Sequence, residues 1–248
     1  MSPGHEPGRS RTLVGVRRSE LGDEVCDGGE VMSVASRTAR DERGAATRES
    51  ILRAAERLFA ENGMYAVSNR RISEELGLGN SAAVTYHFGT RTELVRAIVR
   101  GHGERMEHLR ASMVATPGDS ASLRYWVACL VRPMTEHLAE SGGPTWYARF
   151  AAQIAADPTL HEIAHEDSLS SPSLWFALDG LNRCLPELPE NVRTERWNMG
   201  RHLTTHMCVE RERAIAEGTP TLHADWESFA NGLIDAVVGL WLAPVTHH

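Results

Sequence analysis

The sequence predicts an all-α fold of about nine helices in two parts, a small N-terminal three-helix unit and a larger helical domain. From Thr47 onward, apolar residues recur three and four positions apart, which is the spacing of a helix face. No segment shows the strict apolar and polar alternation of a strand, and no internal repeat is present. Gly and Pro residues divide the pattern into separate helices.

The first 45 residues precede this pattern. They are rich in Gly, Ser, Arg and acidic residues and have no apolar periodicity. Because such a composition cannot bury enough apolar surface to fold, residues 1–45 are expected to form a disordered tail. Nothing upstream of Met32 predicts a structural element, so Met32 is an alternative start of the protein.

The first helix is predicted from Thr47 to Asn62. Thr47 and Ser50 supply capping side chains at its start, and Asn62-Gly63 is a typical C-terminal stop. Its apolar residues follow the i, i+3, i+4, i+7, i+8 spacing of a single helix face. These residues are Ile51, Ala54, Ala55, Leu58 and Phe59.

Two short helices come next, separated by a glycine turn. Ser68 is expected to cap the first of them, over residues 68–76. Gly77-Leu78-Gly79 forms the turn, because glycine adopts the left-handed conformations that tight turns need. The second short helix is predicted from residue 80 or 81 to about residue 88.

A longer helix follows from Arg91 to about Met113, with Thr90 as its cap. Beyond it the chain keeps a helical periodicity that Gly, Ser and Pro residues interrupt. Helices are predicted there over residues 119–140, 144–156, 158–166, 172–185, 191–217 and 223–242.

The total charge argues against a nucleic-acid partner, whereas its distribution along the chain does not. The 248 residues include 26 basic and 33 acidic side chains, a net charge of −7, and every basic residue is arginine. Arginine is a planar cation that suits phosphate. Residues 1–45, 46–100 and 101–248 carry net charges of −1, +2 and −8, respectively. The acidic excess therefore lies in the larger helical domain.

The small unit over residues 46–100 has the order of elements of a helix-turn-helix. Two short helices joined by a glycine turn and supported by a preceding helix can place the second short helix in the major groove, while the first crosses the phosphates. We therefore expect residues 46–100 to be a DNA-binding domain and residues 101–248 to be a separate helical domain.

This unit also contains a distinctive set of spaced residues. They are Ile51, Ala54, Ala55, Leu58, Phe59, Gly63, Ile72, Gly77, Tyr86, His87, Phe88, Arg91, Glu93 and Leu94. Over roughly residues 47–100 the set resembles the DNA-binding domain of TetR-family transcriptional regulators. The resemblance implies a homodimer, usually a repressor, whose helical C-terminal domain binds a small ligand and dimerises through its last two helices.

Two positions depart from the pattern of that family. Thr85 stands where many members have a tyrosine that contacts phosphate, and Arg91 stands where lysine is usual. Arg91 is expected at the start of the fourth helix, where its charge and the free N–H groups of the helix can both meet a phosphate. The phosphate contact can accordingly come from Thr85 or from Tyr86.

The candidate DNA-binding residues fall into two groups. Asn can read adenine, and Ala and Thr can pack on thymine methyl groups, so base contacts are expected at the start and outer face of the recognition helix. Base contacts are assigned to Asn80, Ser81, Ala82, Ala83 and Thr85. Phosphate and sugar contacts are assigned to Arg48, Ser68, Asn69, Arg70, Arg71, Tyr86, His87 and Arg91. Alternatively, Tyr86 and His87 pack in the domain core, and Arg70 or Arg71 only pairs with Glu74 or Glu75.

A ligand pocket is predicted among the middle helices, where aromatic and sulfur-containing side chains recur with a few polar ones. The candidate lining residues are Trp126, Cys129, Met134, His137, Trp146, Arg149, Phe150, Gln153, Trp175 and His202. This set predicts an effector that is a small, largely apolar or aromatic molecule. The alternative for the apolar members is that they fill the core of the bundle.

A dimer interface is predicted on the last helix, over 223–242. A near-continuous apolar stripe runs along it, with small residues that permit close helix approach. The stripe consists of Phe229, Leu233, Ala236, Val237 and Leu240. Together with the helix over 191–217 it would form a four-helix interface, unless it closes the core of the monomer instead.

One segment matches an enzyme motif. In the HExxH signature of zinc proteases, two histidines one helical turn apart bind zinc and the glutamate acts as general base. His161, Glu162 and His165 fit this spacing, but the HxxGxxH extension is absent and no third ligand is in helical reach. We interpret the segment as a solvated helix, and the pair His202 and His206 as structural. No catalytic residue, metal or cofactor is therefore expected.

The remaining features predict a cytoplasmic protein. The four cysteines form no CxxC pair, which favours reduced thiols, and no apolar run is long enough to span a membrane. The sequence as a whole predicts a homodimeric, ligand-responsive repressor, not an enzyme, released by a small molecule from a pseudo-palindromic double-stranded DNA operator. An activator on the same scaffold and a zinc hydrolase using His161, Glu162 and His165 are the alternatives.

Overall fold

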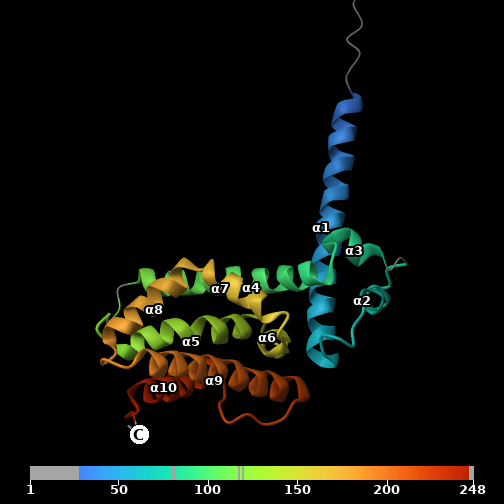
Figure 1. Cartoon of the computed structure of the whole chain (residues 1–248). Helices are drawn as coiled ribbons and strands as arrows, with labels where there is room; N and C mark the ends of the chain where they lie inside the picture. Colours follow the sequence, from blue (N-terminus) through green and yellow to red (C-terminus); the bar gives the residue numbers. More distant parts are fainter. Residues whose placement is uncertain (1–27, 80–81, 117, 119, 246–248) are drawn as a thin grey trace, which may run out of the picture. The chain divides into compact units, whose positions relative to one another are not determined.

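The computed structural model describes residues 28–79, 82–116, 118 and 120–245 (Figure 1). The described residues form ten α-helices and no strand, which confirms the all-α prediction, and each helix corresponds to one of the predicted helical ranges. The chain divides into two compact units, residues 1–44 and residues 45–248. None of the described helices is both long enough and apolar enough to cross a membrane.

The first helix, α1 (Gly28–Asn62), begins well before the predicted start at Thr47. Residues 28–46 contain no proline and several Ala, Arg and Glu residues, which are good helix formers. The expected disorder is therefore wrong for residues 28–45, which are helical, although the two units of the chain do meet at residues 44 and 45. Residues 1–27 lie outside the described residues, and so does the disorder predicted for them. The prediction that no structural element precedes Met32 falls mostly on the same residues.

The next three helices are α2 (Asn69–Glu75), α3 (Ala82–Phe88) and α4 (Arg91–Ala115). The predicted caps of α2 and α4 are confirmed, since the Ser68 hydroxyl accepts the N–H of Arg71 at 3.2 Å and the Thr90 hydroxyl accepts the N–H of Glu93 at 3.1 Å, whereas Thr47 and Ser50 lie inside α1 and cap no helix start. The core that holds α1 to α4 together is almost completely buried. It includes Ile51, Leu58, Phe59, Ile72, Val84 and Leu94.

Six helices build the larger domain. They are α5 (Leu123–Glu140), α6 (Tyr147–Ala156), α7 (His161–Leu169), α8 (Pro172–Cys184), α9 (Glu190–Glu217) and α10 (Trp226–Leu242). Their ends lie within a few residues of the predicted ones. α5 is central, because it packs against α4, α8 and α10 (Figure 1).

Two arginines of α9 hold the two ends of α10. Arg196 donates hydrogen bonds of 2.6 Å to the carbonyl oxygens of Trp241 and Ala243, which the end of a helix would otherwise leave unpaired. Arg211 donates to the carbonyl oxygen of His223 at 3.1 Å, before α10 begins. α9 and α10 are therefore joined by polar contacts at both ends of α10.

A chain of three side chains joins α1, α4 and α5. Nε2 of His102 lies 2.9 Å from Oε2 of Glu56, and Nδ1 of His102 lies 2.6 Å from Nε2 of His137. Because a carboxylate accepts only, His102 donates through Nε2; in the neutral form of this ring, Nδ1 accepts and His137 donates through Nε2. Nδ1 of His137 is then a buried acceptor without a hydrogen-bond partner among the described residues.

Candidate nucleic-acid interface and effector cavities

The predicted helix-turn-helix is formed by α2, the turn after it and α3. Gly77 has a φ of 62°, a left-handed value that favours glycine, and the N–H of Leu78 bonds the carbonyl oxygen of Ser73 at 2.9 Å. Val84 and Phe88 anchor α3 in the core. The turn thus fixes α3 against the domain and leaves its other face toward solvent.

The outward face of α3 carries Thr85 and Tyr86, both of them exposed. The Tyr86 side chain is 85% exposed, so its ring is not part of the domain core. Ala82 is exposed as well, whereas Ala83 and His87 are half-buried. His87 lies edge-on to the Tyr86 ring with 5.2 Å between ring centroids.

The start of α2 brings together four of the predicted phosphate contacts. Ser68, Arg70 and Arg71 are exposed and Asn69 is half-buried. Arg70 forms an ion pair of 2.7 Å with Glu74, as the alternative interpretation predicts. Arg71 does not pair with an acidic residue within the described ranges, and its Nη2 atom lies 3.5 Å from Oδ1 of Asn62.

Arg91 and Arg48 both lie against aromatic rings. Nη1 of Arg91 donates to the carbonyl oxygen of Val67 at 2.6 Å, and its guanidinium lies 4.9 Å from the centre of the Phe59 ring. Burial lowers the pKa of Arg91. This differs from the expected phosphate contact, because the side chain turns into the domain. The exposed Arg48 covers the Phe88 ring at 4.9 Å. Asn80 and Ser81 lie outside the described residues.

Polar contacts connect this domain to the larger one. The Gln153 amide donates to the carbonyl oxygen of Phe59 and accepts the N–H of Met64, both at 2.9 Å. The Tyr65 hydroxyl donates to Asp157 at 2.6 Å. α6 and the loop after it therefore bind the end of α1 and the segment that leads to α2.

The predicted ligand residues do not surround one cavity. Trp126, Cys129 and Phe150 are completely or almost completely buried in the core, and Met134 packs partly buried against it. The Trp126 ring lies directly on Gly180 of α8. These four side chains therefore fill the bundle, which was the alternative interpretation for them.

The polar members of that set have structural partners. Arg149 pairs at 2.8 Å with Glu212 of α9, while Gln153 binds α1 as described and His137 binds His102. Trp146 donates to Glu61 at 3.2 Å. Of the predicted set, Trp175 and His202 line separate surface hollows, and His137 and Trp146 together line a smaller cavity of about 260 Å³.

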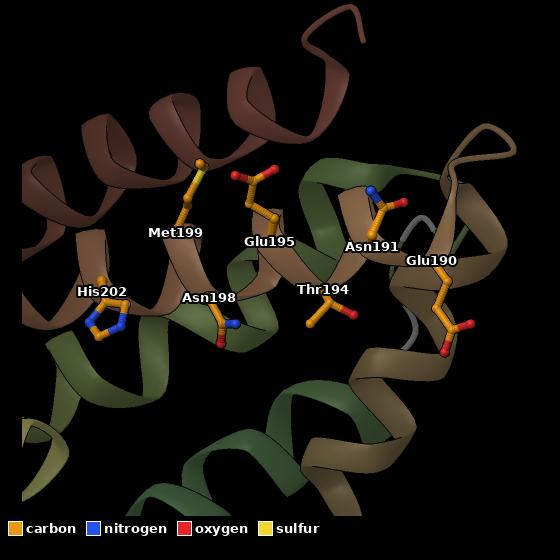
Figure 2. Close-up of a pocket in the computed structure, with 7 residues that line it drawn as sticks. All are labelled: Glu190, Asn191, Thr194, Glu195, Asn198, Met199 and His202. Atoms are coloured by element: carbon orange, nitrogen blue, oxygen red, sulfur yellow. The ribbon is translucent and has the colours of Figure 1, made fainter. Parts of the chain in front are cut away.

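The larger hollow, of about 1090 Å³, follows one face of α9 alone (Figure 2). His202 and Met199 lie on this face with Asn198, Glu195 and residues near the start of the helix. Because one helix supplies every lining residue, the hollow has no opposing wall among the described residues that could enclose a small molecule.

A second cavity, of about 520 Å³, is lined by α7, α8, α9 and α10. We call it the tryptophan groove, because Trp175, Trp197 and Trp241 line it together with leucines of α8. Trp197, Trp241 and Arg193 at its rim were not predicted. Arg193 and Trp197 lie one helical turn apart on α9, a spacing that the sequence does contain, but Trp241 comes from α10, so no local spacing groups all three.

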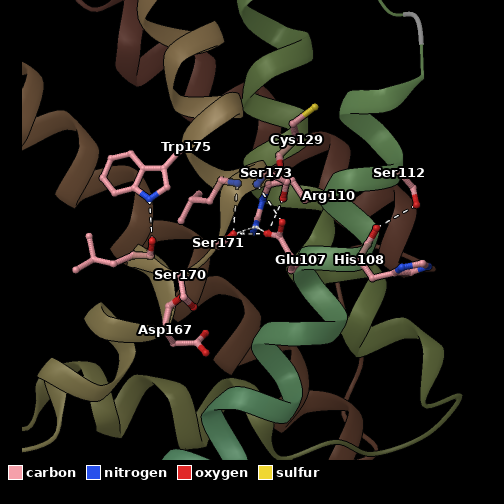
Figure 3. Close-up of polar contacts among 12 residues, drawn as sticks. Glu107, His108, Arg110, Ser112, Cys129, Asp167, Ser170, Ser171, Ser173 and Trp175 are labelled. Carbon is pink, nitrogen blue, oxygen red and sulfur yellow. Dashed lines mark hydrogen bonds and ion pairs between the residues drawn. The ribbon is translucent and has the colours of Figure 1, made fainter.

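The start of α8, beside the groove, is fixed to α4 (Figure 3). The carboxylate of Glu107 accepts the hydroxyls of Ser171 and Ser173, and the N–H of Ser173 at 3.0 Å. Arg110 binds the Ser171 hydroxyl and the carbonyl oxygen of Cys129, each at 3.2 Å. A movement of α8 would therefore act directly on α4.

The apolar stripe of α10 is divided between core and surface. Phe229, Leu233 and Val237 are 5% exposed and pack in the core of the monomer, whereas Ala236 is exposed and Leu240 is half-buried. α9 passes close at Gly200, where an added Cβ would contact Val237 and Leu240 at 3.7 and 3.8 Å.

The HExxH segment forms the start of α7. His161, Glu162 and His165 are all exposed, and Ile163 is the buried residue of this helix. Among the described residues, no group of three or more His, Cys, Asp or Glu side chains is arranged to hold a metal ion. Within the same residues, Cys129, Cys184 and Cys208 are free thiols.

The fold and the exposed recognition helix define a helix-turn-helix regulator with an appended helical domain. Residues 51–98 match the family of bacterial regulatory proteins of the tetR type, and residues 128–239 match the tetracyclin repressor-like C-terminal domain. Together the two matches cover more than half of the chain. The chain belongs to the TetR family of transcriptional regulators.

Solved structures support the fold. AmtR from Mycobacterium smegmatis superposes with a TM-score of 0.53 at 18% identity, over 80% of this chain and 87% of that one. The TetR-family regulator PfmR from Thermus thermophilus superposes with a TM-score of 0.50 at 17% identity, over 78% of this chain and 99% of that one. No curated protein matches the sequence significantly.

Proposed function

We propose that this TetR-family regulator is a homodimeric repressor that binds a pseudo-palindromic operator and releases it when a small molecule binds. The observation that carries the proposal is the exposed face of α3, where Thr85 and Tyr86 have no part in the domain core. A face of this kind can read base edges, while Ser68, Asn69 and Arg71 at the start of α2 reach phosphates.

The DNA-binding domain has a net charge of only +2, so few cationic side chains are available to bind phosphates. Arg70 pairs with Glu74, and Arg91 is directed into the domain. Phosphate binding therefore depends on Arg71, on hydroxyls and on the N–H groups at the start of the long helix α4. Such a surface binds weakly as one copy, so two copies on one operator supply the affinity.

Dimerisation is proposed through α9 and the open face of α10. Ala236 and Leu240 lie on that face, and space beside Gly239 is open within 4 Å. Met199 of α9 is 46% exposed and adds apolar area. A symmetric pair of these helices would place the two recognition helices about one helical turn of DNA apart, roughly 34 Å.

The DNA proposal is tested by selection of double-stranded DNA from a random pool with the full chain. We expect enrichment of a pseudo-palindrome, and weaker binding to it by at least tenfold for Tyr86→Ala. Leu222→Ala is the matched control, because Leu222 is a 99% exposed apolar side chain in the loop before α10. A pool without enrichment, or equal binding by all three proteins, would contradict the proposal.

The dimer and the mode of regulation need separate measurements. Light scattering should give twice the chain mass for wild type and a reduced mass for Ala236→Arg, with Ser112→Arg on α4 unchanged. A promoter reporter that carries the selected site should be silenced by the protein. If the protein instead increases transcription of the reporter, it is an activator and the proposed repressor mode is wrong.

A further inference from the structure

The tryptophan groove has an apolar interior. Trp241 is 2% exposed and Leu181 is 1% exposed, so both belong to its floor, and Trp175 stands 49% exposed at one side. The indole N–H of Trp175 donates to the carbonyl oxygen of Leu169 at 3.1 Å. This bond uses the only polar atom of the indole ring and holds the ring in place. Trp175 therefore presents aromatic surface to the groove and no unpaired hydrogen-bond donor.

The rim of the groove carries one guanidinium, that of Arg193, and one carboxylate, that of Asp179. Arg193 uses one donor on the carbonyl oxygen of Leu188, at 3.2 Å, and no carboxylate within the described parts of the chain pairs with it. A guanidinium has five N–H donors, so the others are available. Asp179, the acidic residue that lines the groove, forms an ion pair with Arg183 and is therefore neutralised.

We infer that the tryptophan groove binds an aromatic organic anion, a planar apolar body with one carboxylate, and that the carboxylate pairs with Arg193. The volume of about 520 Å³ is within the range of small-molecule sites. Aromatic walls favour a flat ring system, and a guanidinium at the mouth holds a carboxylate by two parallel hydrogen bonds. The role of this molecule as effector rests on the proposed function, whereas its binding does not.

The position of the groove gives the anion a route to DNA affinity. Trp175 lies two residues after Ser173, whose N–H and hydroxyl are bound by Glu107 of α4 (Figure 3). A ring bound beside Trp175 contacts α8 close to its start, and this start is fixed to α4, the helix that continues from the DNA-binding domain. A ligand changes DNA affinity only if it binds the forms of high and low DNA affinity unequally. The contact between Glu107 of α4 and the start of α8 is where these two forms can differ.

The test uses 2-naphthoate and its neutral isostere 2-naphthamide, titrated calorimetrically into the full chain. We expect naphthoate to bind at least tenfold more tightly than the amide. Arg193→Gln should reduce naphthoate binding to the level of the amide, and Arg193→Lys should recover part of it. Arg213→Gln is the matched control, since Arg213 is an exposed arginine of the same helix outside the groove.

A second variant tests the location. Leu178→Trp fills the groove and should abolish binding of both probes, with the circular dichroism spectrum unchanged. Equal binding of naphthoate and amide to wild type would overturn the anion preference, and undiminished binding to Leu178→Trp would overturn the site. Selected DNA, measured without probe, tests the proposed function independently. If naphthoate binds in the groove but does not release this DNA, the groove is a binding site for the anion, and its role as an effector site is overturned.

Discussion

The carboxylate of Glu212 on α9 accepts the backbone N–H of Ala148 on α6 at 2.9 Å. The same carboxylate accepts the Thr145 hydroxyl and both the N–H and the guanidinium of Arg149. Glu212 is 1% exposed, so a side chain distant in sequence satisfies the free donors at the start of α6. α6 also binds the DNA-binding domain through Gln153, which makes Glu212 part of the support for that contact.

Replacement of Glu212 by Ala should lower the free energy of unfolding by about 3 kcal/mol, because it leaves buried donors and the Arg149 charge without a partner. Urea denaturation followed by circular dichroism measures this. Glu210→Ala, at an exposed position of the same helix, should stay within about 0.5 kcal/mol of wild type. A similar loss in both variants would contradict the capping role.

Arg91→Ala should cost stability more than DNA affinity. The side chain loses its bond to Val67 and its contact with the Phe59 ring, together worth about 1–3 kcal/mol. Because the guanidinium does not face the DNA surface, the slope of log affinity against log salt should not change. A slope reduced by about 1, with unchanged stability, would show instead that Arg91 binds a phosphate.

Arg71→Ala should show the opposite behaviour. Arg71 is exposed at the start of α2 and makes one long contact with Asn62, so its removal should leave the unfolding free energy within about 0.5 kcal/mol. If it meets a phosphate, binding weakens similarly for all DNA sequences, and the salt slope falls by about 1. Fluorescence anisotropy at several salt concentrations measures both effects, and an unaltered slope would exclude Arg71 from the interface.

His137 should make the protein less stable in mild acid. Burial and the neighbouring His102 lower the pKa of His137 from 6.5 to about 4, against the opposing effect of Glu140 and Glu56. Between these two values the unfolded chain binds more protons than the folded one, so stability falls as pH falls from about 6.5 to about 4. The loss from this group should be on the order of 2–3 kcal/mol.

The measurement is urea denaturation at pH 7 and pH 4. His137→Gln cannot be protonated, so it should lose less stability than wild type over this interval. His108→Gln, at an exposed histidine of α4, should behave as wild type does. A pH dependence that is the same in all three proteins would assign the acid sensitivity to other groups.

Gly180→Ala should be strongly destabilising, because an added Cβ would lie 2.3 Å from the Trp126 ring. The ring or α8 must shift, at a cost of about 1–3 kcal/mol or more. Gly101→Ala in α4 is the control, since nothing lies within 4 Å of its added Cβ and alanine favours the helix by roughly 0.5–1 kcal/mol. Equal melting temperatures of the two variants would argue against this packing.

The short-range features of the fold could be predicted from the sequence. Ser68 and Thr90 cap their helices, and Gly63 and Gly77 adopt left-handed conformations where helices end, because these effects involve neighbouring residues only. The early start of α1 was missed, since a polar helix without an apolar face has no periodicity to recognise.

The lining of a cavity such as the tryptophan groove depends on which helices meet, and a sequence pattern does not contain this information. Trp126 and Phe150 lie on buried helix faces. The spacing of apolar residues on such a face is the same whether the face borders a cavity or packs against another helix. The contacts of Arg91 are of the same kind: its position at a helix start could be predicted, whereas its contacts with the Phe59 ring and the Val67 carbonyl depend on the tertiary fold. Base and phosphate contacts stay predictions.

The hold of Arg196 on the carbonyl oxygens of Trp241 and Ala243 has a practical consequence for protein engineering. A chain truncated before Ala243 would lose one of the two carbonyl oxygens that Arg196 binds, and α10 would be held less firmly to α9. Shortened or fused forms of this regulator should therefore retain residues up to and including Ala243.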